Sequence, residues 1–192
     1  HLGYIDTFLL AGAVGGAFVA RAEISGWPIF GWMMRNAYQV FIDREDMRDA
    51  ARVLQLIDDA LNHDDGVIMF AEAACSRGTK VHPFRAPLFQ VPALRGMPVH
   101  CATITYATPP GYPAAGDDVV WWRHEEFNAH FQRLLRLPYF YATLTFAPEP
   151  ISAPDRKQLA ARCHAEVSRN FTPIAQGVLP ELPPPPGTKV FL

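Results

Sequence analysis

Residues 46–70 read DMRDAARVLQLIDDALNHDDGVIMF, and this stretch decides the fold class. Its first part has apolar residues at steps of three and four, which predicts a helix over 46–62 with one buried face. The polar run 64–66 ends that helix. The short apolar run 67–70 that follows is typical of a buried parallel strand. A helix leading directly into such a strand indicates an α/β fold.

The same alternation continues on both sides of this stretch. Upstream, the sequence predicts a helix over 6–13, a strand over 17–20, a helix over 27–37 and a strand over 38–42. Downstream, it predicts strands over 99–106 and 142–146 and helices over 125–136 and 154–170. Strands that alternate with helices indicate one α/β domain whose mostly parallel central sheet is flanked by helices. We expect this domain to fill residues 1–175 and a proline-rich, extended tail to occupy 176–192.

Composition excludes several classes of protein. Of the 192 residues 49% are apolar and 19% charged, which suits a folded chain with a real core. The net charge of −2 gives no global basic field for nucleic acid. Three widely spaced cysteines and scattered histidines predict neither a disulfide framework nor a metal site, and indicate a reducing compartment. Because the chain begins with His1 rather than Met, we expect the natural sequence to extend upstream.

His1 and Asp6 form an H-x4-D pair that is the first candidate for catalysis. If His1 lies in a loop and Asp6 one turn inside the following helix, their side chains can meet. Asp6 would then accept a hydrogen bond from one ring nitrogen and leave the other nitrogen as a base. The spacing alone fits equally a surface histidine at a frayed terminus.

Two further charged residues follow predicted strands. Arg44 comes directly after the strand over 38–42, where its planar fork is placed to grip a phosphate or to form an ordinary surface salt bridge. Glu72 follows the apolar run 67–70, where a carboxylate is costly to bury unless it is paired. Glu72 is therefore either solvated in a cleft at the strand ends or paired with a cation such as Arg44.

The segment 73–116 contains no acidic residue but four cations, Arg77, Lys80, Arg85 and Arg95. A positive segment in a chain of net negative charge indicates a docking face for the phosphates of a substrate, although a solvated basic loop has the same composition. We count Ser76, Arg77 and Arg85 among the candidate substrate-binding residues.

Several blocks, in this order, resemble the glycerolphosphate and 1-acylglycerol-3-phosphate acyltransferase family. They are HLGYID (1–6), ARAEISGWPIFGW (20–32), VFIDRED (40–46), FAEAACSRGTKVHPFR (70–85) and GMPVHCATITY (96–106). The resemblance covers residues 1–175 and implies the α/β fold of that family. It also implies that His1 is the general base, Asp6 its orienting acid, Arg44 a ligand of the acceptor's phosphate and Glu72 an acceptor-binding residue.

The function implied by the resemblance is O-acyl transfer from acyl-CoA or acyl-carrier protein to the free hydroxyl of a lysophospholipid such as 1-acylglycerol-3-phosphate. No cofactor is implied beyond that co-substrate, and the expected location is the cytoplasmic face of the bacterial inner membrane. The chain departs from the family where Ala71, Ala73 and Ala74 replace the proline, glycine and threonine of FPEGT, and Cys101 stands where proline is common. Loss of the glycine removes easy access to positive φ.

Two other functions stay open at this point. A thioester or lipid hydrolase would use Cys75 or Ser76 as nucleophile with His82, His100 or His1 as base. A catalytically silent lipid-binding homologue would fit the altered FAEAA block.

Overall fold

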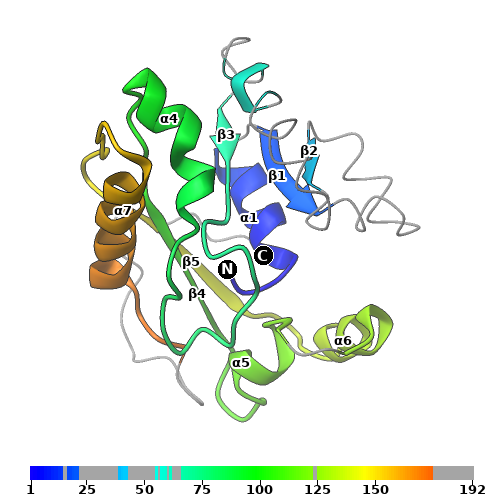
Figure 1. The fold of residues 1–192 in the computed structure, drawn as a ribbon. Helices are drawn as coiled ribbons and strands as arrows, with labels where there is room; N and C mark the ends of the chain where they lie inside the picture. The colour runs from blue at the N-terminus through cyan, green and yellow to red at the C-terminus, as the bar shows by residue number, and fades with distance from the viewer. Residues whose placement is uncertain are drawn as a thin grey trace.

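The computed structural model describes residues 1–14, 17–21, 39–42, 55, 57–59, 61, 66–122 and 125–174. It combines two small sheets with helices, and the chain begins near the middle of the molecule (Figure 1). The predicted helix over 27–37 and the predicted tail over 176–192 lie outside these residues. No helix among them is long and apolar enough to span a bilayer.

The first sheet is parallel. Strand β1 (Ala17–Arg21) lies between β2 (Gln39–Ile42) and β3 (Val67–Ile68), and both neighbours run in its direction. All three strands fall where the sequence predicts them, although β3 is shorter than the apolar run 67–70. The described residues of the predicted helix over 46–62, namely 55, 57–59 and 61, are helical. An α/β unit is therefore confirmed for this half of the chain.

The second sheet corrects the prediction of a mostly parallel central sheet. Strands β4 (Ala102–Ala107) and β5 (Tyr141–Phe146) pair antiparallel, and in the described residues they form a sheet of their own. The two strands are linked by helices α5 (Ala115–Asp118) and α6 (Phe127–Leu134). The register pairs Ala107 with Tyr141, so the chain enters β5 at the end where it left β4.

Helices cover this second sheet on one side. Helix α7 (Arg156–Asn170) packs against β4, against α4 (Gln90–Arg95) and against the 3-10 turn η2 (Ala86–Phe89) (Figure 1). Its first turn is capped by the side chain of Asp155, which accepts hydrogen bonds from the main-chain N–H groups of Lys157 and Gln158. The prediction of a helix over 154–170 is confirmed.

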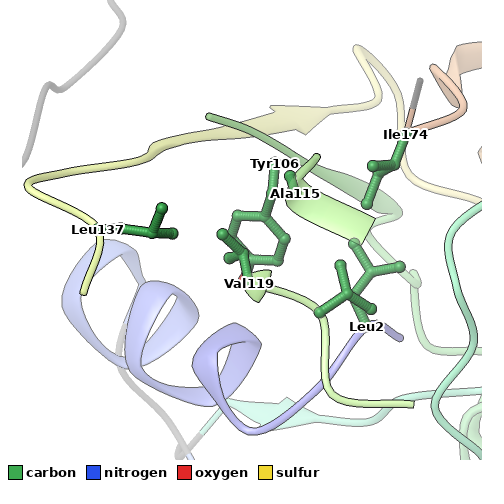
Figure 2. Close-up of a cluster of buried hydrophobic side chains, with 7 residues drawn as sticks. Leu2, Tyr106, Ala115, Val119, Leu137 and Ile174 are labelled. Atoms are coloured by element: carbon green, nitrogen blue, oxygen red, sulfur yellow. The ribbon is translucent and has the colours of Figure 1, made fainter. Parts of the chain in front are cut away.

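Two clusters of buried side chains hold these elements together. The first joins the start of the chain to β4 and α5 (Figure 2) and contains Leu2, Tyr106, Ala115, Val119, Val120, Leu137 and Ile174. The second lies between β4, α4 and α7 and contains Phe89, Ala93, Cys101, Ala153, Leu159, Ala160 and Cys163. The first cluster fixes the loop that precedes α1 (Ile5–Ala13), because Leu2 is part of it.

Candidate active site

His1 and Asp6 meet in the way that the sequence predicts. His1 lies in the loop before α1, Asp6 lies in the first turn of that helix, and His1 Nδ1 is 2.6 Å from Asp6 Oδ2. The carboxylate is wholly buried and also accepts main-chain hydrogen bonds from Leu2 at 2.6 Å and Gly3 at 3.3 Å. Its place in a first helical turn further favours its negative charge. Asp6 is therefore a fixed acceptor for the Nδ1–H of His1.

The second oxygen of Asp6 has a partner that sequence reasoning missed. The hydroxyl of Tyr106, in β4, donates to Asp6 Oδ1 at 2.7 Å. Burial and the neighbouring Asp6 raise the pKa of Tyr106 well above its usual range, so the phenol stays protonated and donates. Tyr106 is the last residue of the block GMPVHCATITY. Nothing in the sequence indicates that its side chain reaches Asp6, 100 positions earlier.

The His1 ring is held by its surroundings as well as by Asp6. It stacks on Phe70 with ring centroids 3.8 Å apart and planes inclined by 15°, and 17% of its side chain is exposed. Burial lowers the pKa of His1, but hydrogen bonds to Asp6 and to the Cys75 thiol outweigh burial and raise this pKa to about 10. The imidazole is consequently rigid, strongly basic and accessible along one edge.

The loop after β3 grips the main chain of His1. The Glu72 carboxylate contacts the nitrogen of His1, and the N–H of Ser76 donates to the carbonyl of His1 at 2.9 Å. The other carboxylate oxygen of Glu72 accepts from the main-chain N–H of His82 at 2.8 Å. Burial raises the pKa of Glu72, although these donors oppose the shift. Glu72 is therefore held beside His1 by the main-chain N–H of His82; Arg44, the partner considered above, lies outside the described residues.

The same loop keeps the left-handed turn that the family glycine would favour. Ala73 stands at that position and has a φ of +59°. Among the described residues, it is the one residue other than glycine with a positive φ. Its N–H donates to the carbonyl of Phe70 at 2.9 Å, which closes the turn. The departure from FPEGT therefore changes the cost of the turn rather than its geometry.

A cavity of about 710 Å³ opens beside the His1 ring. Its wall is mainly apolar and comes from α1, β3, η2, β4 and α7, for example Leu10, Ile68, Phe89, Ile104 and Val167. The polar side chains on the wall include His1, Glu72, Ser76, Lys80 and His100. A largely apolar hollow with few polar groups at a basic imidazole is suited to a small molecule with a long apolar part.

The cations of the basic segment 73–116 lie at different places relative to the cavity. Arg77 pairs with Asp117 at 3.0 Å and lies 5.9 Å from the ring centre of Trp122, away from the cavity wall. Arg85 is also absent from that wall, whereas Lys80 and Ser76 contribute to it. Arg95 pairs with Asp58 at 2.6 Å. The structure thus brings Glu72 and Ser76 to the His1–Asp6 pair, but not Arg77 or Arg85.

The geometry also bears on the two open alternatives. Cys75 hydrogen-bonds His1 but does not line the cavity, which disfavours it as a nucleophile toward a substrate held there. His82 contributes its main-chain N–H, and His100 stands on the cavity wall. Within the part of the chain that the structure describes, no group of three or more His, Cys, Asp or Glu side chains could hold a metal ion.

The chain is similar to known acyltransferases. The Acyltransferase family model matches residues 1–105. The lyso-ornithine lipid O-acyltransferase of Rhodobacter capsulatus is 30% identical over 174 residues, which are 87% of this chain and 62% of that protein. The 1-acyl-sn-glycerol-3-phosphate acyltransferase of Neisseria gonorrhoeae is 31% identical over 130 residues, 64% of this chain and 51% of that protein.

A solved structure shares the fold. The 1-acyl-sn-glycerophosphate acyltransferase of Thermotoga maritima superposes with a TM-score of 0.60 at 18% identity, over 89% of this chain and 62% of that one. The chain thus spans between half and two thirds of the length of these proteins. Since the family model covers more than half of its residues, the chain belongs to the acyltransferase family.

Proposed function

We propose that this chain is the catalytic part of an O-acyltransferase that moves a fatty acyl group from a thioester donor to the free hydroxyl of a lysophospholipid. The observation that carries this proposal is the His1–Asp6 pair at the wall of an apolar cavity. The volume of about 710 Å³ falls inside the range of about 300–1,000 Å³ that is usual for ligand pockets. An acyl chain is the apolar group that such a wall would favour.

In the proposed reaction His1 is the general base. Asp6 holds the proton on Nδ1, so that Nε2 of the neutral ring takes the proton of the acceptor hydroxyl. The hydroxyl oxygen then attacks the thioester carbonyl, the carbon–sulfur bond breaks, and the imidazolium returns the proton to the leaving thiolate. No acyl-enzyme is needed. General base catalysis of this kind contributes typically about 10²–10⁴-fold.

The donor would be acyl-CoA or acyl-carrier protein, and the acceptor a lysolipid whose headgroup carries a phosphate or carboxylate. The names of the two relatives point to a lyso-ornithine lipid and to 1-acyl-sn-glycerol-3-phosphate as candidate acceptors. Lys80, on the cavity wall, and Arg44, by its place in the VFIDRED block, are the proposed contacts of the headgroup anion. Replacing either should raise the KM for the acceptor more than it lowers kcat.

We further propose that the protein works at the cytoplasmic face of the bacterial inner membrane, where lysolipids reside. Large apolar side chains around α6 and the start of β5 support membrane contact, because Leu135 is 66% exposed and Tyr139 and Tyr141 stack edge to face in the open. Binding to vesicles with and without anionic phospholipid tests the membrane contact.

The test of the proposed reaction is thiol release from acyl-CoA, measured with and without 1-acylglycerol-3-phosphate or lyso-ornithine lipid. Acceptor-dependent release is expected, and the His1→Ala variant should lose at least about 10²-fold of it. His82→Ala is the matched control, because it removes an exposed imidazole from the same site and keeps the N–H that binds Glu72. Thiol release at the same rate without acceptor would instead identify a hydrolase. No thiol release in any assay would indicate a protein that binds lipid without catalysis.

A further inference from the structure

Two cysteines far apart in the sequence share one wall of the cavity. Cys101 immediately precedes β4 and Cys163 lies in the middle of α7. Their side chains belong to one buried cluster, with 6% and 1% exposed, and each thiol has the largest influence on the pKa of the other. A single buried cysteine is often inert and fills apolar space, but two neighbouring thiols have a chemistry that a single one lacks.

Both residues line the cavity of about 710 Å³. A small neutral solute that enters the cavity therefore reaches the two sulfur atoms without unfolding the protein. The backbone on either side is well anchored, because the carbonyl of Cys101 accepts from Ala147 at 2.8 Å and α7 is capped by Asp155. The two thiols are thus held together rather than brought together by chance encounters.

The contact also divides the roles of the two thiols. The hydrogen bond from Cys163 lowers the pKa of Cys101, whereas the same bond and burial raise the pKa of Cys163. Cys101 is consequently the thiol that more readily becomes the nucleophilic thiolate, and Cys163 is the partner poised to resolve its oxidation product.

We propose that Cys101 and Cys163 are a modification site that closes to a disulfide when hydrogen peroxide enters the cavity. The Cys101 thiolate attacks one peroxide oxygen, which breaks the O–O bond, forms a sulfenic acid and releases hydroxide. Cys163 sulfur then attacks the Cys101 sulfur and displaces a second hydroxide. Each thiol gives up its proton to one of these hydroxides, so two thiols and one peroxide yield one disulfide and two waters.

Formation of the disulfide would change the shape of the cavity beside His1. An S–S bond of about 2.05 Å is shorter than any contact between two thiols, so the bond draws the start of β4 toward α7 and narrows the wall they share. Long acyl chains would then be accommodated less well than short ones. This consequence rests on the proposed function, whereas the disulfide itself does not.

The site is tested first by chemistry alone. The purified protein is treated with hydrogen peroxide, remaining thiols are alkylated, and peptides are mapped without and with reductant. A peptide pair joined through Cys101 and Cys163 is expected, should disappear on reduction, and should be absent from Cys101→Ala and Cys163→Ala. Both cysteines recovered as alkylated thiols, oxidised singly, or joined instead to Cys75 would overturn the proposal.

The second measurement compares acyl donors of different chain length before and after oxidation. In the parent protein the ratio of long-chain to short-chain turnover should fall several-fold and recover with reductant. The ratio should not change in Cys163→Ala, which keeps Cys75 and so controls for oxidation beside His1. An unchanged ratio in a fully cross-linked protein would refute the effect on the cavity. Absence of transfer with every donor would refute the proposed function and leave the peptide map to decide the disulfide.

Discussion

Tyr106→Phe is the substitution that most directly tests how the site is held. It removes one hydroxyl from a side chain that stays apolar, so the packing of the surrounding cluster is preserved (Figure 2). The hydroxyl donates at 2.7 Å to Asp6 Oδ1, and no other donor to that oxygen is recorded among the described residues. Hydrogen bonds to charged groups contribute about 1.5–3 kcal/mol, and the variant leaves a wholly buried carboxylate oxygen without its donor. We therefore expect a loss of about 1.5–3 kcal/mol in the free energy of unfolding.

The assay is urea unfolding of Tyr106→Phe beside Tyr112→Phe, which deletes the same hydroxyl from a side chain that is 46% exposed. The control should change stability by less than about 0.5 kcal/mol, as surface substitutions usually do. In the transfer assay kcat should fall while the KM for the acceptor stays the same, because Tyr106 orients Asp6 and does not line the cavity. Equal stability of the two variants would refute the reasoning.

Further results are expected at Ala73, at His1 and at Asp155. Ala73→Gly should stabilise the protein by up to about 1 kcal/mol in urea unfolding, because relief of a left-handed alanine exceeds the extra entropy of glycine in the unfolded chain; a loss of stability would contradict the turn. Because the pKa of His1 is raised to about 10, kcat/KM should still rise with pH between 7 and 9, and Asp6→Asn should move that rise to lower pH. The same shift stabilises the fold fully below pH 6.5, and this contribution should disappear as the pH passes about 10. Asp155→Ala should cost about 1 kcal/mol of stability by uncapping α7, with turnover per folded molecule unchanged.

The sequence predicts those elements that depend on interactions between residues a few positions apart. The H-x4-D pair could be placed because one helical turn sets the distance from loop to carboxylate, and α7 because Pro154 and Asp155 mark its start. Helix α4 was missed, since Pro92 lies inside it and reads as a breaker although it falls in the first turn, where its absent N–H costs little. The antiparallel pairing of β4 and β5 was missed because strands that alternate with helices favour parallel pairing, and the residues of a strand do not encode its direction.

The contacts of His1 explain why the resemblance survives the altered FAEAA block. The block over 1–6 supplies Asp6, the block over 70–85 supplies the ring of Phe70 and the carboxylate of Glu72, and the block over 96–106 supplies Tyr106. The substitutions at Ala71 and Ala73 fall in the same loop, where these residues contribute main-chain hydrogen bonds. The carbonyl of Ala71 accepts from Arg85, as the carbonyl of a proline could, and the N–H of Ala73 donates to Phe70, as the N–H of a glycine could. Blocks distant in the chain are therefore tied to one imidazole through groups that these departures leave in place. It follows that a change at 70, 72 or 106 should damage the site more than restoring the family residue at 71 or 73 improves it.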